Sequence, residues 1–292
     1  MTEKSLRIGA CEIHWLSGGD FRLDGGTMFG PVPKTIWQNK FPAAADNTLS
    51  LCNDPLLIRT PSMNILVDSG LGNKLTPKQQ SVFRTTDWLL LSQLALLGIS
   101  RQDIDLVILT HCDFDHAGGV VMVGEDGREE VTFPAAIHLI QETEWQDVAS
   151  PCRRAQESYW PINFNELKKN GHIQFVHGDR ELCPEVRVRH TGGHTRGHQL
   201  VEISSQGETA VHLGDLFPTH AHANPLWVMA YDNFPLEVIA CKERYFAEYR
   251  KLDAWFTFYH DPLVRACKLG DKGAFTDQWP QKKEKSDHPA TA

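Results

Sequence analysis

The chain has 292 residues, of which 41% are hydrophobic and 23% are charged, a composition typical of globular proteins. Its formal net charge of −8 argues against nonspecific nucleic-acid binding, which requires a basic surface. No apolar run approaches the ~18 residues of a membrane span, and the first residues lack the charged and apolar regions of a signal peptide, so we expect neither feature.

Short apolar runs rich in β-branched residues predict strands along most of the chain. They lie at residues 64–67, 104–109, 135–140, 185–189, 199–203, 209–213 and 254–259. Helices are predicted from Asp87 to Gly98 and from Pro235 to Leu252, where apolar residues recur at helical spacing. This mixture predicts a layered α/β or α+β domain. We expect one domain over residues 1–280 and a disordered polar tail over residues 281–292.

The strand predicted at 104–109 is followed by a dense group of imidazole and carboxylate side chains. The group consists of His111, Asp113, Asp115 and His116. Alternate residues of an extended segment point the same way, so His111 and Asp113 can share one ion while Asp115 and His116 turn toward a second. Cys112 then points away from the ions and is expected to be a packed thiol. The following Gly118 and Gly119 are expected to bend the backbone and start a helix.

Three later strands also end in potential ligands. They deliver His190, His194 and His198, then Asp215, and finally His260. Rigid strands position short loops, so sites in sheet proteins gather at strand ends. Imidazole together with carboxylate suits Zn, Mn or Fe(II) rather than Ca or Mg. We expect His198 to lie beside the ligands and His190 and His212 to be packed or supporting residues.

In order and spacing these residues resemble the signature of the metallo-β-lactamase superfamily, which is His-x-His-x-Asp-His, a Gly-flanked His, a lone Asp and a late His. The matching positions are His111, Asp113, Asp115, His116, His194, Asp215 and His260. The resemblance implies an α+β fold, an αβ/βα sandwich of two mixed, mostly antiparallel sheets with helices outside and metals at one edge. It also implies that Asp68 does not bind the metal itself but orients a metal-binding histidine.

Further segments are similar to one branch of that superfamily, the quorum-quenching N-acyl-homoserine-lactone lactonases. They are residues 23–34, 214–218 and 224–232. This resemblance implies two divalent ions per chain, zinc first, with Mn or Fe(II) as alternatives. A metal-bridged hydroxide would open the lactone, with Asp115 and Asp215 as catalytic residues. The expected substrate pocket consists of Met28, Phe29, Phe217, His222, Trp227 and Tyr231; these aromatic residues could equally anchor long loops.

The sequence departs from the family pattern at two positions. Asp113 stands where the family has its second histidine, so three ligand carboxylates would leave two divalent ions with a net charge of +1 instead of +2. The lower charge reduces the Lewis acidity of the two ions, and a carboxylate favours harder ions such as Mn or Fe(II). The first metal site, at His111, Asp113 and His194, is therefore expected to be weak, differently loaded or empty. The second departure is Pro218, at a position where the lactonases have a tyrosine. His220, His222 and Tyr231 are the candidates to replace it.

Three functions therefore stay open from the sequence. The first is a lactonase, the second an organophosphate or carboxylic ester hydrolase on the same binuclear core, and the third a ligand-binding protein whose catalysis Asp113 has impaired. The expected partner is a small-molecule substrate, with no nucleic acid, no membrane and a possible homodimer. The seven cysteines contain no Cys-x-x-Cys pair, which indicates free thiols and a reducing cytoplasm.

Overall fold

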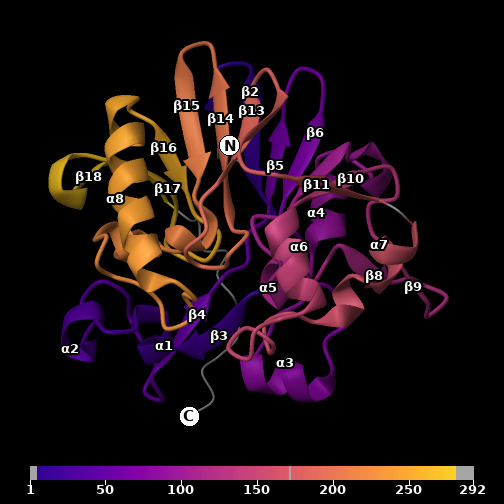
Figure 1. Cartoon of the computed structure of the whole chain (residues 1–292), viewed down its shortest axis with the longest axis horizontal. Helices are drawn as coiled ribbons and strands as arrows, with labels where there is room; N and C mark the ends of the chain where they lie inside the picture. The colour runs from indigo at the N-terminus through magenta and orange to yellow at the C-terminus, as the bar shows by residue number, and fades with distance from the viewer. Residues whose placement is uncertain (1–4, 171, 281–292) are drawn as a thin grey trace.

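The computed structural model describes residues 5–170 and 172–280, which form two large mixed sheets (Figure 1). The first sheet has the strand order β1 (Ser5–Ile8), β2 (Cys11–Trp15), β5 (Leu56–Arg59), β6 (Asn64–Val67), β7 (Leu106–Ile108), β10 (Ile137–Gln141) and β11 (Ile173–Val176). The pairs from β1 to β6 are antiparallel, and those from β6 to β11 are parallel.

The second sheet is antiparallel except where β15 pairs with β16. Its strand order is β12 (Arg180–Cys183), β13 (Val186–His190), β14 (Gln199–Ser205), β15 (Glu208–His212), β16 (Trp255–Thr257), β17 (Val264–Leu269) and β18 (Phe275–Pro280). The strands predicted from the apolar runs are thus confirmed, as is the sandwich of two mixed sheets; the second sheet is mostly antiparallel, and the first is half parallel.

The two sheets share one apolar core. Ile65 and Val67 of β6 pack in it with Val201 and Ile203 of β14. Leu66, between the two β6 residues, points to the opposite face and packs in a second cluster. Side chains alternate across a strand, so a strand buried on both faces reads as a continuous apolar run.

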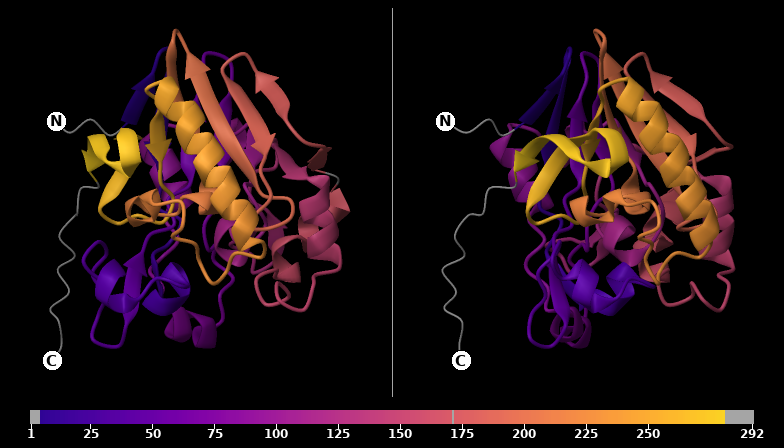
Figure 2. Two further views of the ribbon diagram at one scale, coloured as in Figure 1. Left: turned by 60° about the vertical axis from the view of Figure 1, so that its left-hand side comes forward. Right: turned by 90° about the vertical axis from the view of Figure 1, so that its left-hand side faces the viewer.

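Helices cover the outer face of each sheet (Figures 1 and 2). On the first sheet these are α4 (Leu90–Leu96), α6 (Glu142–Ala149) and α7 (Asn165–Asn170). The second sheet is covered by α8 (Pro235–Lys251), whose Val238, Tyr245 and Tyr249 pack in the cluster that includes Phe256 of β16. Both helices predicted from the sequence are confirmed, although α4 is shorter than expected.

A smaller layer from the N-terminal part of the chain lies beneath the sandwich in Figure 1. It contains β3 (Phe21–Asp24), α1 (Gly25–Phe29), α2 (Lys34–Trp37) and β4 (Thr48–Leu51). Its apolar cluster also includes Ala221 and Met229 from the segment after β15. The remaining elements are α3 (Pro77–Phe83), α5 (Phe114–Ala117), β8 (Val121–Val123), β9 (Glu129–Val131), and the 3-10 turns η1 (Arg101–Asp103), η2 (Pro161–Asn163), η3 (Gly214–Leu216), η4 (His220–Ala223) and η5 (Asp271–Gly273).

The expectation that Gly118 and Gly119 start a helix is wrong. They follow α5, which begins at Phe114, and they precede β8. Their role is close packing, because a Cβ on Gly118 would lie 2.3 Å from the Leu71 carbonyl oxygen and one on Gly119 the same distance from that of Ser69. The glycines therefore let α5 approach the turn after β6.

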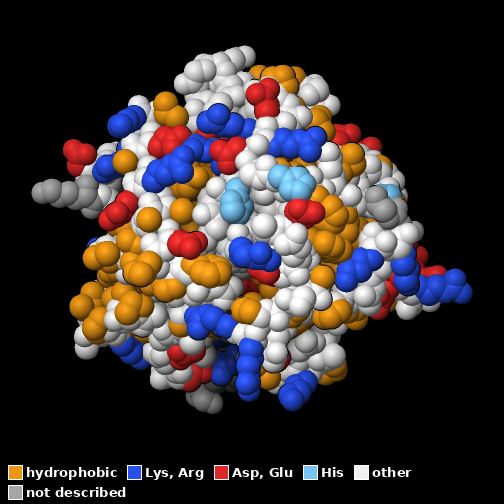
Figure 3. Space-filling model, viewed as in Figure 1, with side chains coloured by type: hydrophobic (Ala, Val, Ile, Leu, Met, Phe, Trp, Pro, Cys, Tyr) orange, Lys and Arg blue, Asp and Glu red, His pale blue; other side chains and the backbone are white. Residues whose placement is uncertain are grey.

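The remaining expectations concern surface charge, membrane spans, the C-terminal tail and the cysteines. Acidic and basic side chains are interspersed on the face shown in Figure 3. Among the described residues, no helix has the length and apolar character needed to cross a membrane. The predicted tail, residues 281–292, lies outside the described residues, and no disulfide joins the cysteines within them.

Candidate metal centre

The seven predicted ligands come from separate parts of the chain and meet in two adjoining groups. One group contains His111, Asp113 and His194, and the other Asp115, His116 and His260; within each group one potential ligand atom per residue lies within 4.8 Å of the others. His111 follows β7, Asp115 and His116 lie on α5, and His194 and His260 follow β13 and β16. All seven side chains are buried or nearly so.

Asp215, in η3 after β15, lies between the two groups. Its Oδ1 is 3.3 Å from Nε2 of both His116 and His260, and its Oδ2 is 3.6 Å from Nε2 of His194. A carboxylate with one oxygen toward each group is placed to bridge two ions. Burial opposes ionisation of Asp215, but His260 and His116 outweigh burial and hold its pKa well below the ordinary value.

The four histidines direct the same ring nitrogen, Nε2, to the centre. Each Nδ1 faces an acceptor: the Thr110 hydroxyl for His111 at 3.0 Å, Asp68 for His116 at 2.9 Å, Asp232 for His194 at 2.9 Å and the Cys52 carbonyl for His260 at 2.9 Å. Thr110 itself donates to Asp68 at 2.8 Å, so its oxygen accepts from His111. In a neutral imidazole the proton on Nδ1 leaves a lone pair on Nε2.

Several buried ligand atoms lack any hydrogen-bond partner among the described residues. They are Nε2 of His111 and His194 and one carboxylate oxygen each of Asp113 and Asp215. Nε2 of His116 and Nε2 of His260 face each other at 3.1 Å. Buried polar atoms without partners are costly. Divalent cations would satisfy these atoms, so the residues fit two metal ions.

Protons compete with cations for these histidines. Burial lowers the pKa of His116, but Asp215 and Asp68 outweigh it and raise that pKa well above the ordinary value. Burial also lowers the pKa of His194, but its contacts with Asp113 and Asp232 outweigh burial and raise that pKa well above the ordinary value. Since a metal ligand must be unprotonated, metal binding would displace these protons.

Asp113 reaches the first group despite being shorter than histidine. Its Oδ2 lies 3.8 Å from Nε2 of His111 and 3.6 Å from Nε2 of His194. Asp113 is the N-terminal cap residue of α5, with an extended backbone. The chain therefore turns at Asp113, and Asp115 faces the second group, where its Oδ2 is 3.6 Å from Nε2 of His260.

Two predicted supporting residues lie behind the ligands. Asp68 is fully buried and also accepts from the backbone N–H of Thr110 at 2.8 Å. His198 accepts from the backbone N–H of Asp215 through Nε2 at 3.2 Å, and its Nδ1 lies 2.6 Å from the Thr191 hydroxyl. Each holds a ligand segment in place. Cys112 is buried, as a packed thiol would be.

Sequence reasoning missed a buried carboxylate in α6, Glu144. It binds both ligand segments of the first group: Oε1 accepts from the backbone N–H of Cys112 at 2.9 Å, and Oε2 from the Thr195 hydroxyl at 2.6 Å and the N–H of Gly197 at 3.1 Å. Burial raises the pKa of Glu144 to about 7. In sequence it looks like an ordinary acid in the first turn of a helix.

Asp232 and Tyr259 were also missed as supporting residues. Asp232 is 1% exposed and holds His194. The Tyr259 ring stacks on His116 with centroids 4.2 Å apart, and its hydroxyl donates to the Asp115 carbonyl at 2.8 Å. In the sequence Asp232 follows Tyr231, and Tyr259 precedes His260. The roles of Asp232 and Tyr259 depend on long-range contacts, which residue spacing does not reveal.

Most of the residues expected to line a substrate pocket are packed inside the protein. Met28, Phe29, Phe217 and His222 are each at most 2% exposed. Both ring nitrogens of His222 are engaged, by the Thr219 hydroxyl at 2.8 Å and the Met28 carbonyl at 2.9 Å. These four side chains therefore offer no surface to a substrate and instead anchor the segments after β3 and β15.

Tyr231 differs from these packed residues because 39% of it is exposed. Its hydroxyl donates to Thr27 at 2.6 Å, since the Thr27 hydroxyl already donates to the Asp24 carbonyl. Burial raises the pKa of the Tyr231 phenol, and the charge of Asp115 raises it further. The phenol therefore stays protonated close to the second ligand group.

Comparison with known proteins gives one family over most of the chain. Residues 54–262 match the profile of the metallo-beta-lactamase superfamily. The structure of a probable metal-dependent hydrolase from Staphylococcus aureus is 37% identical, with a TM-score of 0.90 over 95% of this chain and 99% of that one. The matched residues include every predicted ligand.

More distant relatives include lactonases. An N-acyl homoserine lactonase from a Bacillus species is 26% identical over 52% of this chain and 58% of its own length. A probable metallo-hydrolase from Mycobacterium tuberculosis is 26% identical over 64% of each chain. The chain thus spans less than two thirds of these curated relatives. A dizinc quorum-quenching lactonase shares the fold, with a TM-score of 0.76, 23% identity, and coverage of 96% of this chain and 97% of that one.

Proposed function

The chain belongs to the metallo-beta-lactamase superfamily of metal-dependent hydrolases, and from this premise we propose that it is a binuclear lactonase. The proposed substrates are N-acyl-homoserine lactones or similar lactones. Zinc is the proposed metal, with Mn or Fe(II) as alternatives. A homodimer and a cytoplasmic location stay predictions from the sequence.

One observation carries this proposal: four buried histidines each direct Nε2 toward a centre that also holds three carboxylates. His111, His194 and Asp113 would hold one ion, His116, His260 and Asp115 the other, and Asp215 would bridge them. Two such ions supply a water of lowered pKa and an electrophile for the substrate oxygen. The lactone class itself is supported by relatives named as lactonases.

Asp115 is the proposed proton donor for the leaving group. When a lactone ring opens, a water oxygen bonds to the carbonyl carbon, the ring C–O bond breaks, the water gives up one proton and the released alkoxide takes one up. Asp115 would pass this proton from the water to the alkoxide through one carboxylate oxygen while its other oxygen faces the ion, and burial, which raises its pKa, favours that transient proton. Tyr259 fixes the Asp115 backbone, which leaves the side chain to face the centre.

Among the three candidates for the missing lactonase tyrosine, we propose Tyr231. His222 is buried with both nitrogens engaged, and His220 lies 2.5 Å through Nδ1 from Asp261. Tyr231 is 39% exposed, and its hydroxyl is protonated and held by a single threonine. A turn of its O–H from Thr27 toward a substrate carbonyl would stabilise negative charge developing on that oxygen.

The test combines elemental analysis with two assays on the same purified sample, hydrolysis of an N-acyl-homoserine lactone and of an aryl phosphotriester. We expect about two equivalents of metal per chain and preferential lactone turnover. Asp215→Ala should abolish turnover while circular dichroism stays unchanged, since the Asp215 carboxylate is no part of the apolar core. Phosphotriester turnover alone would favour the esterase alternative, and no turnover after adding Zn, Mn or Fe(II) would favour a binding protein.

A further inference from the structure

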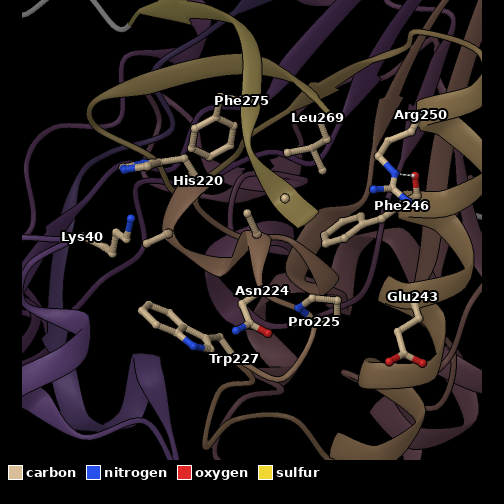
Figure 4. A pocket seen from close by; sticks show the side chains of 13 residues that line it. Lys40, His220, Asn224, Pro225, Trp227, Glu243, Phe246, Arg250, Leu269 and Phe275 are labelled. Atoms are coloured by element: carbon tan, nitrogen blue, oxygen red, sulfur yellow. Dashed lines mark hydrogen bonds between the residues drawn. The ribbon is translucent and has the colours of Figure 1, made fainter. Parts of the chain in front are cut away.

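A cavity of about 520 Å³ lies between α8, the segment after β15 and the end of the second sheet (Figure 4). This volume is in the range of small-molecule sites, roughly 300–1,000 Å³. Phe246 of α8, Leu269 of β17, Phe275 of β18 and Trp227 give it apolar walls. Such walls favour an alkyl chain.

The charged groups of the cavity are unevenly distributed. Figure 4 shows Lys40 beside His220 and Phe275, and Glu243 on the opposite side, on α8. In the described part of the chain, no carboxylate lies within 4.0 Å of the Lys40 ammonium group. Arg250, by contrast, is occupied by the Gly270 and Phe246 carbonyls at 3.1 and 3.2 Å. An anionic group would therefore be attracted to the Lys40 end and repelled from the Glu243 end.

The cavity is separate from the metal centre. None of the seven proposed ligands lines it. The cavity wall includes Trp227, which packs edge-on against Phe29 with centroids 5.8 Å apart. A ligand in the cavity would touch the segment after β15 and would not compete with a substrate for the ions.

We propose that this cavity binds one amphipathic monocarboxylate, with its alkyl chain along Phe246, Leu269 and Phe275 and its carboxylate at Lys40. The apolar walls favour the alkyl chain of the ligand, and the ammonium group of Lys40 favours its carboxylate. The binding does not depend on lactone hydrolysis, so it can succeed or fail independently of the proposed function.

Calorimetric titration of the metal-loaded protein with decanoate tests this inference. We expect saturable binding of one molecule per chain, weaker binding of 1-decanol, and a three- to fivefold loss of decanoate affinity in Lys40→Gln, as for an exposed ion pair of about 1 kcal/mol. Lys34→Gln is the matched control, because Lys34 begins the neighbouring α2 and does not line the cavity. It should bind decanoate with unchanged affinity.

A carboxylate can also bind metal ions, so a second pair of variants separates the two sites. Ala223→Leu adds bulk to the cavity wall and should weaken decanoate binding, whereas Asp215→Ala should leave it unchanged. Thermal unfolding of each variant checks that the fold is kept. Absence of saturable binding overturns the proposal. So does binding that Asp215→Ala abolishes and Lys40→Gln leaves intact, since that result would place decanoate at the metal centre.

Discussion

Oδ1 of Asp232 lies 2.9 Å from Nδ1 of His194, and Oδ2 of the same carboxylate accepts the backbone N–H of Met229 at 2.7 Å. One buried side chain thus joins a proposed metal ligand to the segment that carries Trp227 and Tyr231. It sets the proton of His194 on Nδ1 and points Nε2 at the centre. Partners of this kind orient ligands and increase their basicity.

Asp232→Asn should therefore weaken metal binding more than it weakens the fold. We expect metal affinity to fall about 10–100-fold, because the amide no longer attracts the Nδ1 proton of His194. Competition with a chromogenic chelator measures this affinity. Asp126→Asn, at an exposed carboxylate, is the control. Equal affinity in both variants would contradict the assigned role.

The first metal site should depend on the carboxylate of Asp113. Asp113→Ala removes one of the donors of that group, so elemental analysis should find about one metal equivalent per chain. Asp113→His restores the family's usual residue and should keep two. Asp87→Ala, at an exposed position, should leave the metal content unchanged. If Asp113→Ala retained two equivalents, Asp113 would not be a ligand.

Removal of the Glu144 carboxylate should destabilise the protein. Glu144→Ala leaves the buried N–H groups of Cys112 and Gly197 without an acceptor. Each unsatisfied buried donor costs about 1–3 kcal/mol, so the free energy of unfolding should fall by roughly 2–6 kcal/mol in urea denaturation. Glu142→Ala is the matched control on the same helix, because Glu142 pairs with His177 at the surface. Similar losses in the two variants would refute the role.

His138 should make the protein sensitive to acid. It lies in β10 with no partner for either ring nitrogen among the described residues, and burial lowers its pKa from 6.5 to about 3. The unfolded chain therefore binds this proton more readily, and stability falls as pH decreases from about 6.5 toward 3. The slope for one such group is at most about 1.4 kcal/mol per pH unit.

Urea denaturation across this pH range, compared with His138→Phe, isolates the effect. The variant should lose less stability on acidification, because phenylalanine takes up no proton. His177→Gln, at an exposed histidine, should follow the parent protein. A variant curve parallel to that of the parent would show that His138 takes up its proton equally in the folded and unfolded chains, which would contradict the lowered pKa.

Some features follow from the order of residues alone. Apolar runs such as residues 64–67 predict doubly buried strands because side-chain alternation then requires apolar residues on both faces. Ligands that directly follow strands, such as His111 and Asp215, can be predicted because short loops keep them at the strand end. These local relations are independent of how distant segments pack.

Other features depend on which distant segments meet, and only the tertiary structure decides them. Glu144 reaches Thr195 across 51 residues, and Asp232 reaches His194 across 38, so no spacing predicts either contact. The burial of Phe217 and His222 is decided by packing around them, since the same side chains suit a pocket or a core. Close approach of the turn after β6, rather than a helix start, explains Gly118 and Gly119.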